Sequence, residues 1–374
     1  MTFPFHRLPE LLSAAVACYA NWKLWCWFGL RPLWRLPVMV WAGGSFLFTI
    51  PRIARQIPYN DTFEWWRAMG TAWAVATTGA FLLIWLLRWF QAPAATDPSR
   101  RKLLRLATGA AFAVPAAVTG YGVFINRHRF QLNAVDIPVR NLPKPLEGLR
   151  LVQLTDIHMS PLLGPREVER AVDMANETRA HIALVTGDMI TMRRDPIDDC
   201  LRILAGLRAE AGVYGCLGNH EIYAGCQDYA TAQAARFGIR FLRGASAEIR
   251  FGGALLNLAG VDYQPRQLPY LQGAEKLLHP QAVNVLLSHN PDVFPVAARL
   301  GYDLTVSGHT HGGQVTVEIL NQYANVTRFY TRYVSGLYLD AGASIHVSRG
   351  LGTIGPPLRL GAPPEVTLLR LCAG

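Results

Sequence analysis

The N-terminal third of the chain consists of apolar runs separated by short polar loops. Residues 68–87 and 106–126 hold 20 and 21 uncharged residues, enough to cross a bilayer of about 30 Å at about 1.5 Å per residue. Residues 36–51 form a shorter run of 16, and residues 11–29 form a fourth that contains one lysine. Such runs in succession predict a membrane region over residues 1–130, with three or four transmembrane helices.

From residue 131 the pattern changes to short apolar runs that alternate with amphipathic helical stretches. The apolar runs are rich in Val, Ile and Leu, which is typical of strands in sheets covered by helices. The expected strands cover residues 149–156, 181–188, 212–219, 239–242, 255–262, 283–290 and 304–311, and the expected helices cover residues 165–179, 197–208 and 227–237. Residues 137–149 are interpreted as a proline-containing connector. The alternation predicts an α/β domain over residues 131–374.

Charge separates the same two parts. The first 130 residues carry 14 Lys and Arg against 4 Asp and Glu, while the remainder carries 22 of each, so the net charge of +10 belongs to the membrane region. A neutral C-terminal part argues against nucleic acid as a partner. Five basic residues lie between positions 88 and 105, and the positive-inside rule places this loop in the cytoplasm. The part after residue 127 is then expected on the outer face of the membrane.

Residues 99–105, with the sequence SRRKLLR, resemble the twin-arginine export motif and precede an Ala-rich stretch. An ordinary basic flank of a membrane helix has the same composition, and the sequence leaves both interpretations open. The first would make the twin-arginine export machinery a partner, which exports domains that have already folded and bound metal.

Side chains that bind metals follow the ends of the apolar runs. The candidates are Asp156, His158, Asp188, Asn219, His289, His309 and His311. The i, i+2 spacing of each Asp-x-His and His-x-His pair predicts that both side chains share one face. Mixed nitrogen and oxygen ligands suit Mn, Fe or Zn better than Mg or Ca. Seven ligands are too many for one ion, so we expect two divalent ions that share one carboxylate.

These motifs resemble those of the calcineurin-like metallophosphoesterases. They occur in the order of that family: D-x-H (156–158), G-D (187–188), G-N-H (218–220), H (289) and G-H-x-H (308–311). Three further motifs resemble its membrane-associated bacterial subgroup: S-H-N-P-D (288–292), G-H-T-H-G-G-Q (308–314) and S-R-G-L-G-T (348–353). The resemblance covers residues 147–371. It implies an αββα sandwich of two mixed sheets flanked by helices, attached to a bacterial inner membrane.

The resemblance also assigns roles to the candidate residues. It places Asp156, His158, Asp188 and His311 on one metal, and Asp188, Asn219, His289 and His309 on the other. Asp188 would bridge the two ions, and His220 would be the catalytic histidine near the leaving group. The implied reaction is in-line attack on phosphorus by a metal-bridging hydroxide, with His220 protonating or stabilising the departing alkoxide.

The chain departs from the family at two places. Glu221 stands where Asp is usual, and the extra methylene puts the orientation of His220 in question. Asp262 and Tyr263 stand where the subgroup often has two acidic residues, so neither is assigned a role in the site.

Several other polar residues have structural interpretations. His346 is read as a core residue and Arg349 as a partner in a structural ion pair, although Arg349 could also contact a substrate phosphate. Asp195 is read as part of an exposed helix start. Cys216 is read as a small apolar strand residue, while its pairing with Cys226 is left open.

The sequence thus predicts a membrane-anchored phosphoesterase with two metal ions, which is best read as a phosphodiesterase. Its location suggests phosphate-ester substrates that are lipid-linked. One alternative is a nucleotide-lipid pyrophosphatase of the UDP-diacylglucosamine type, which some relatives are, with a cytoplasmic active site. The other is a non-catalytic membrane scaffold that contains a structural metal cluster.

Overall fold

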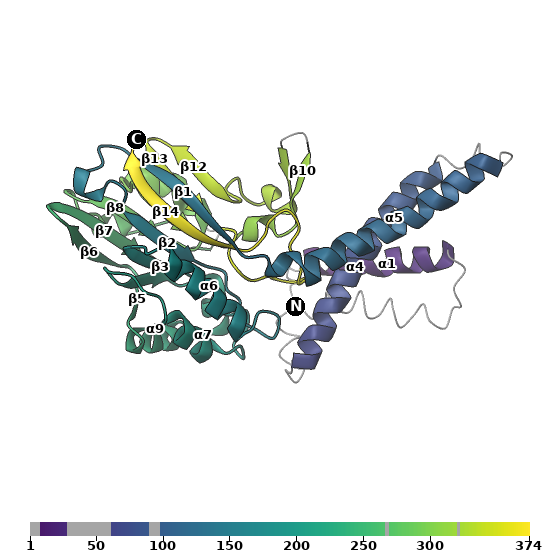
Figure 1. Cartoon of the computed structure of the whole chain (residues 1–374), viewed down its shortest axis with the longest axis horizontal. Helices are drawn as coiled ribbons and strands as arrows, with labels where there is room; N and C mark the ends of the chain where they lie inside the picture. The colour runs from purple at the N-terminus through teal and green to yellow at the C-terminus, as the bar shows by residue number, and fades with distance from the viewer. Residues whose placement is uncertain (1–7, 28–60, 90–97, 266–268, 320–321) are drawn as a thin grey trace. The chain divides into compact units, whose positions relative to one another are not determined.

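The computed structural model of the chain describes residues 8–27, 61–89, 98–265, 269–319 and 322–374 (Figure 1). These residues divide into two compact units. The N-terminal unit consists of residues up to Asn126 together with residues 354–358, and the catalytic unit consists of the rest.

The described residues of the N-terminal unit form three long helices, α1 (Leu8–Trp27), α4 (Asp61–Trp89) and α5 (Pro98–Phe124). Polar side chains join α1 to α4. Asn21 donates from Nδ2 to Thr77 Oγ1 at 3.0 Å, and Trp73 Nε1 donates to Asn21 Oδ1 at 3.1 Å. Hydrogen bonds of this kind hold apolar helices together where apolar burial alone does not distinguish a neighbouring helix from lipid.

Two helices of the described residues are long and apolar enough to cross a membrane, at Asp61–Arg88 and Leu106–His128. The sequence predicted three or four. The third expected span, residues 36–51, lies outside the described residues, and the fourth is helical in α1 but does not reach the same length and apolarity. The basic motif at residues 99–105 forms the first turns of α5.

The catalytic unit contains two six-stranded sheets, each of which mixes parallel and antiparallel pairs. The first has the order β1 (Gln131–Val139), β14 (Glu365–Ala373), β2 (Arg150–Leu154), β3 (Ile182–Thr186), β4 (Val213–Cys216) and β5 (Ile239–Phe241). The second has the order β12 (Gly336–Asp340), β13 (Ala343–Val347), β9 (Leu304–Ser307), β8 (Val283–Leu287), β7 (Ala254–Gly260) and β6 (Ala245–Phe251). A separate hairpin joins β10 (Val317–Ile319) to β11 (Gln322–Ala324).

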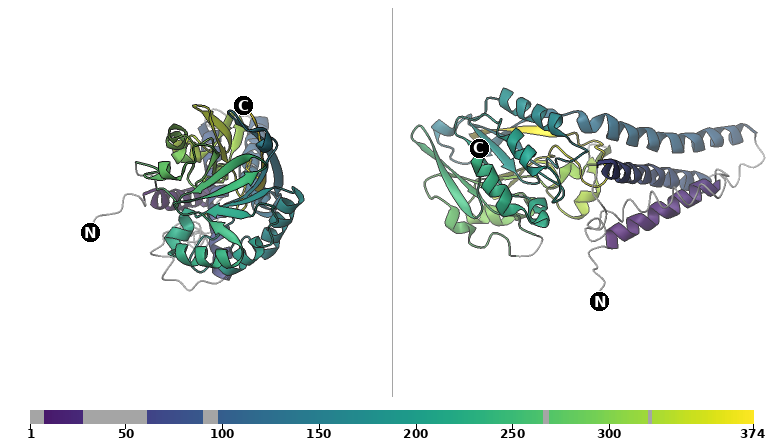
Figure 2. Two further views of the ribbon diagram at one scale, coloured as in Figure 1. Left: turned by 90° about the vertical axis from the view of Figure 1, so that its left-hand side faces the viewer. Right: turned by 90° about the horizontal axis from the view of Figure 1, so that it is seen from below.

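Apolar side chains of both sheets meet in one core, which includes Leu151, Leu184, Leu256 and Val285. A second core packs the first sheet against α6 (Pro165–Glu177), α7 (Ile197–Leu204) and α9 (Gln227–Arg236). A third packs the second sheet against α10 (Phe294–Leu300) (Figure 1, Figure 2). Strands β3, β7 and β8 are buried along their whole length because each lies between two such cores. The predicted αββα sandwich is therefore confirmed.

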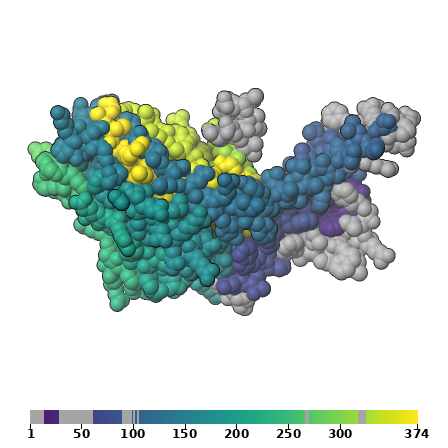
Figure 3. All heavy atoms as spheres, viewed as in Figure 1, coloured from purple at the N-terminus to yellow at the C-terminus, as the bar shows by residue number. Residues whose placement is uncertain are grey.

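The reading of residues 137–149 as a connector was wrong for its first three residues. They complete β1, which pairs in parallel with β14 at the edge of the first sheet (Figure 1). The space-filling view shows yellow atoms of the C-terminal end of the chain at the surface beside blue ones (Figure 3). Pro138 is tolerated there because an edge strand has one side without a strand partner, so a missing N–H costs no ladder hydrogen bond. The interpretation of Cys216 was correct: it is buried at the end of β4, and both it and Cys226 are free thiols.

A polar network joins the two sheets below the loops that carry the candidate ligands. Gln153 on β2 donates from Nε2 to Thr186 Oγ1 on β3 at 2.7 Å and to the Ser307 carbonyl on β9 at 2.9 Å. Its Oε1 lies 3.3 Å from Nδ1 of His346 on β13. His346 is buried, as predicted, and burial lowers its pKa from 6.5 to about 4.

We expect His346 to make the fold sensitive to acid. Below about pH 6.5 the unfolded chain takes up a proton on this ring, whereas the folded protein keeps it neutral until about pH 4. Stability is therefore present above pH 6.5 and lost as the pH falls towards 4, by about 2 kcal/mol at pH 5. Urea titrations of the wild-type chain and of His346→Gln at pH 7 and pH 5 measure this loss. Equal losses in the two proteins would contradict the assignment, since all other histidines are shared.

Candidate metal centre

Loops at the ends of four buried strands carry six of the seven candidate ligands, and the start of α8 carries the seventh. Asp156 and His158 follow β2, Asp188 follows β3, His289 follows β8, and His309 and His311 follow β9. Asn219 is the first residue of α8 (Asn219–Ala224). The strands β2 and β3 are parallel neighbours in one sheet, and β8 and β9 are parallel neighbours in the other. Their carboxyl ends therefore open on the same edge of the sandwich.

The backbone of these loops is strained. Ten non-glycine residues described by the structure have a positive φ, and five of them are candidate ligands: Asp156, His158, Asp188, His309 and His311. Each such conformation costs on the order of 1–3 kcal/mol and persists only where the surroundings enforce it. The sequence attributed the shared direction of the i, i+2 pairs to strand pleating. The left-handed turns beyond the strand ends are the actual cause.

Two glycines let the loops approach each other closely. A Cβ on Gly218 would lie 2.1 Å from Asp188 Oδ1, and a Cβ on Gly308 would lie 2.2 Å from Asp156 Oδ2. Any side chain at either position would displace a carboxylate. The glycines of the G-N-H and G-H-x-H motifs are thus required by contact with the ligands.

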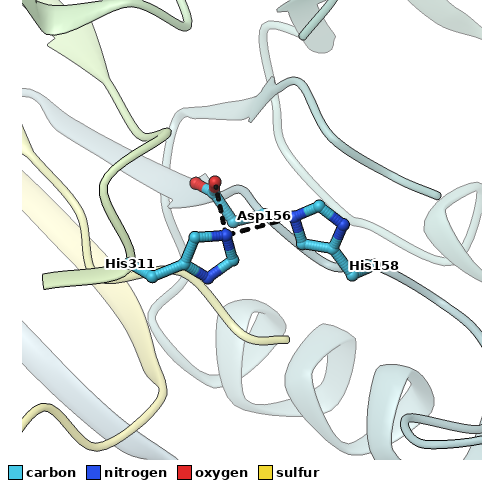
Figure 4. A group of neighbouring side chains, drawn as sticks. All are labelled: Asp156, His158 and His311. Atoms are coloured by element: carbon cyan, nitrogen blue, oxygen red, sulfur yellow. Dashed lines mark hydrogen bonds and ion pairs between the residues drawn. The ribbon is translucent and has the colours of Figure 1, made fainter. Parts of the chain in front are cut away.

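One group of donors consists of Asp156, His158 and His311 (Figure 4). His311 Nε2 lies 3.1 Å from His158 Nε2 and 3.4 Å from Asp156 Oδ1. Two imidazole nitrogens at this distance cannot both carry a proton directed at the other. Either one ring donates to the other, or both present lone pairs to a cation bound beside the carboxylate, and the three donor atoms lie close enough together to hold one.

A second group consists of Asp188, His289 and His309. Asp188 Oδ2 lies 3.0 Å from His289 Nε2, and the same oxygen lies 3.6 Å from His158 Nε2 in the first group. The Asp188 carboxylate is therefore within reach of both groups. Its other oxygen accepts a hydrogen bond from the His220 backbone N–H at 2.9 Å, which fixes its orientation.

Two buried side-chain atoms that could ligate a metal indicate a cation at the second group. Six buried side-chain atoms of the described residues have no hydrogen-bond partner, and two of them, Asn219 Oδ1 and His289 Nε2, belong to candidate ligands. His289 Nε2 has Asp188 Oδ2 as an ion-pair neighbour at 3.0 Å. Leaving a polar atom buried and unsatisfied costs about 1–3 kcal/mol, so such atoms are rare in native proteins. His289 Nδ1 lies 2.7 Å from the Thr186 carbonyl and donates to it, which leaves the Nε2 lone pair free for a ligand. The residues present therefore fit a divalent metal.

The electrostatics of the centre favour a bound cation. Although burial opposes it, the carboxylates of Asp188 and Asp156 raise the pKa of His289 to about 10. Burial lowers the pKa of His158 to about 3, so that ring is neutral and can ligate. Either a proton on His289 or a metal ion bound at Nε2 can balance the negative charge of Asp156 and Asp188.

Comparison with known proteins agrees with this geometry. Residues 149–313 match the calcineurin-like phosphoesterase family. An uncharacterized metallophosphoesterase of Helicobacter pylori is 30% identical over 290 residues, which cover 73% of each chain. The chain belongs to the calcineurin-like phosphoesterase family. Calcineurin-like phosphoesterases use divalent metals, so the chain is a metal-dependent phosphoric ester hydrolase.

Two other relatives extend the comparison. A Bos taurus protein named "transmembrane protein with metallophosphoesterase domain" is 27% identical over 383 residues, which cover 96% of this chain and 83% of the relative. The Bacillus subtilis metallophosphoesterase YkuE is 27% identical over 283 residues, which cover 73% of this chain and 97% of the relative. The similarity to the bovine protein thus includes the part of this phosphoesterase that carries the apolar helices.

Thr191 positions two histidines of the phosphoesterase, although it belongs to none of the motifs. Its carbonyl lies 2.7 Å from His220 Nδ1, and its hydroxyl lies 3.0 Å from His158 Nδ1. The loop that carries Thr191 is held by Asp195, which accepts hydrogen bonds from the backbone N–H groups of Thr191 and Met192. The reading of Asp195 as part of an exposed helix start was wrong, because this carboxylate is buried and caps the loop.

Glu221 also has a different role from the one considered above. Its buried carboxylate accepts backbone N–H groups from Gly218 at 2.8 Å, Asp188 at 3.0 Å and Met189 at 2.7 Å. The longer side chain thus ties the Asp188 loop to the start of α8. The ring of His220 is held by Thr191 rather than by this residue.

We expect Glu221→Gln to destabilise the phosphoesterase by about 2–4 kcal/mol. The amide keeps one acceptor oxygen but presents N–H groups to backbone donors, which then stay buried and unsatisfied. Urea unfolding of the metal-free chain measures the loss. The exposed Glu275→Gln is the matched control and should change stability by less than about 0.5 kcal/mol. A loss as small at position 221 would show that the carboxylate does not hold the loop.

Two further residues beside the ligands were missed. Arg359 is fully buried and donates to the carbonyls of His311, Gly350 and Ala362, and its Nη2 lies 3.4 Å from His311 Nδ1. The ring of Tyr263 lies 5.4 Å from that of His309. Arg359 was missed because an arginine in the G-P-P-L-R-L segment (355–360) is expected to be exposed. Tyr263 was missed because it stands where the subgroup commonly has an acidic residue.

The neighbouring polar residues behave as predicted or nearly so. Arg349 pairs with Glu365 through Nη2 at 2.6 Å and through Nε at 2.8 Å, which confirms its structural role. Asp262 accepts a bidentate hydrogen bond from Arg243 and is therefore part of a structural ion pair. The side of the centre next to Tyr263 is aromatic, because the ring centroids of Tyr223 and Tyr263 lie 6.4 Å apart.

Proposed function

We propose that the chain is a membrane-anchored phosphodiesterase that works with two divalent metal ions, Mn, Fe or Zn. One observation carries the proposal: Asp188 Oδ2 lies between His289 Nε2 at 3.0 Å and His158 Nε2 at 3.6 Å. This oxygen is shared by two groups of donors, as a bridging carboxylate requires. The first ion would be held by Asp156, His158, Asp188 and His311, and the second by Asp188, Asn219, His289 and His309.

Metal ions held there supply an activated water nucleophile and neutralise charge on the phosphoryl oxygens. The residues of the chain do the rest. Asp156 and Asp188 are fixed by backbone N–H groups of His309 and His220, so they do not reorganise during turnover. His220 donates from Nδ1 to the Thr191 carbonyl, which directs Nε2 towards the centre, 4.0 Å from Asp188 Oδ2. A proton on Nε2 is then placed to reach the departing oxygen.

The membrane location is supported by two span-like helices and by the relative named as a transmembrane protein. We place the protein in the inner membrane of a bacterium, with the catalytic unit on the outer face, because residues 88–105 are strongly basic. The twin-arginine export machinery would be a partner if residues 99–105 act as a signal. Substrates would then be phosphate esters of the envelope, including lipid-linked ones.

The alternative topology leads to a different substrate. With the catalytic unit in the cytoplasm, a nucleotide-lipid pyrophosphatase becomes the better proposal. A reporter enzyme fused after Gly374 separates the two cases. Activity of a reporter that functions only outside the membrane supports the outer-face proposal, and activity of a cytoplasmic reporter overturns it.

The substrate class can be tested directly. We expect purified full-length protein, loaded with Mn, Fe or Zn, to hydrolyse bis(para-nitrophenyl) phosphate faster than the corresponding monoester. A nucleotide-lipid pyrophosphate in the same assay tests the alternative. Turnover of none of the three with any metal would favour the non-catalytic scaffold instead.

A further inference from the structure

A short segment of the catalytic unit exposes apolar side chains together. Residues 325–332 contain the 3-10 helix η8 (Val326–Phe329). Phe329 is 89% exposed, the largest value for any large apolar side chain in the described residues, and Val326 and Tyr330 are 68% and 52% exposed. Burying such a side chain against an apolar surface is favourable because it removes apolar area from water. A cluster of this kind marks a contact surface more often than a single exposed residue does.

The segment is held at both ends rather than hanging free. At its start, Asn325 caps η8 by accepting the Arg328 backbone N–H at 3.1 Å, and it lies directly against Gly313 of the G-H-T-H-G-G motif. At its end, Thr331 donates from Oγ1 to Asp292 Oδ1 at 2.5 Å. The apolar face is thus a fixed feature of the unit, supported by the loops that follow His289 and His311.

The charges of the segment indicate what it contacts. Residues 322–335 contain two arginines, Arg328 and Arg332, and no Asp or Glu. Both arginines are exposed. Aromatic and aliphatic side chains next to arginines are typical of surfaces that lie in the headgroup region of an anionic bilayer. Arginines close to anionic headgroups are attracted to them electrostatically.

The position of the segment within the catalytic unit agrees with a contact to the bilayer. The chain enters the unit at Gln131, three residues after the candidate span ends at His128. Arg349 donates to Gln131 Oε1 at 3.5 Å, and the Arg349 side chain lies against Gly312, since a Cβ there would be 2.6 Å from its Cγ. Gly313 in turn lies against Asn325. The segment is therefore at the end of the unit where the chain arrives from the span.

We propose that residues 325–332 form a lipid-contact surface. Val326, Phe329 and Tyr330 enter the boundary between headgroups and acyl chains, while Arg328 and Arg332 bind anionic headgroups. The proposal rests on the membrane attachment proposed above. It brings the loops after His289 and His311 close to the bilayer surface, where a phosphate ester of a lipid is found.

Photocrosslinking of the full-length protein identifies the contact. The photoreactive residue para-benzoylphenylalanine replaces Phe329 in protein reconstituted into vesicles of phosphatidylcholine and phosphatidylglycerol. The matched control carries it at Leu339, which is 63% exposed. Leu339 lies on β12 towards the other end of β1, because Ser344 of the adjoining strand donates to the Pro138 carbonyl at 2.9 Å. We expect lipid adducts at position 329 at least about tenfold more often than at 339.

Each other outcome has a definite meaning. Adducts from position 329 to a peptide of the same chain, adducts to a second copy, or equal lipid adducts at 329 and 339 would overturn the surface while leaving the proposed function intact. Loss of adducts in the double variant Arg328→Gln, Arg332→Gln would support the headgroup contact. Release of the unmodified chain from vesicles by alkaline carbonate would overturn the membrane attachment itself, and the surface with it. Hydrolysis of bis(para-nitrophenyl) phosphate by each variant reports separately on the phosphodiesterase.

Discussion

Replacing Asp188 by Asn is expected to lower the turnover of bis(para-nitrophenyl) phosphate by at least about a thousandfold, since loss of the shared carboxylate removes several kcal/mol of transition-state stabilisation. Asp188 Oδ2 is the atom within reach of both His158 and His289. An amide oxygen carries no charge and cannot bridge two cations as a carboxylate does. Steady-state kinetics together with the metal content per chain measures the effect.

The fold should survive this substitution. Near-ultraviolet circular dichroism of Asp188→Asn should match the wild type, because the backbone N–H of His220 can still be accepted by the amide oxygen. Asp303→Asn is the matched control. Asp303 is another carboxylate that accepts a backbone N–H, from Asn284 at 2.8 Å, but it lies away from the candidate ligands. Wild-type turnover in Asp188→Asn, or an equal loss in the control, would remove the assignment of two metals.

The resemblance carried by the order of the motifs implied the sandwich, and it named candidate ligands of which the structure gathers two groups of donors. The apolar runs that end in Asp156, Asp188 and His289 were visible because fully buried strands leave an uninterrupted run of Val, Ile and Leu. Parallel neighbours then place their carboxyl ends on one edge. These two physical rules explain why the candidate residues gather at one edge, while the sandwich and the roles of the residues were implied by the resemblance to the family.

The remainder depends on three-dimensional contacts that leave no local pattern. Asp156 and His311 have a left-handed backbone that the surrounding loops enforce. The residue types Asp and His do not predict this conformation. Thr191 holds His220 through its carbonyl, which every residue has. Arg359 is buried although arginines are usually exposed. No strand was predicted at β1. One reason is that Pro138 argues against a strand unless the strand is known to lie at the edge of a sheet.

His220 gives the second large effect, and one that depends on the leaving group. We expect His220→Gln to lower the turnover of a phosphodiester with an alkyl leaving group by about 10²–10⁴, the range typical of a lost general acid. A para-nitrophenyl leaving group departs as a stable anion and needs no proton, so its release should fall by less than about tenfold. Turnover of methyl phosphodiesters with alkyl, phenyl and para-nitrophenyl leaving groups measures this difference.

The leaving-group dependence separates proton donation from positioning. His220 Nε2 lies 4.0 Å from Asp188 Oδ2, so a substitution could also act by disturbing a ligand. Such a disturbance would slow all three esters equally and would lower the metal content of the purified chain. Thr191 offers a further distinction, because its hydroxyl contacts His158 while its carbonyl holds His220. Thr191→Val removes the first contact and keeps the second, so it should weaken metal binding without steepening the dependence on the leaving group. The two variants together assign the histidine to the leaving oxygen and the threonine hydroxyl to the ligand.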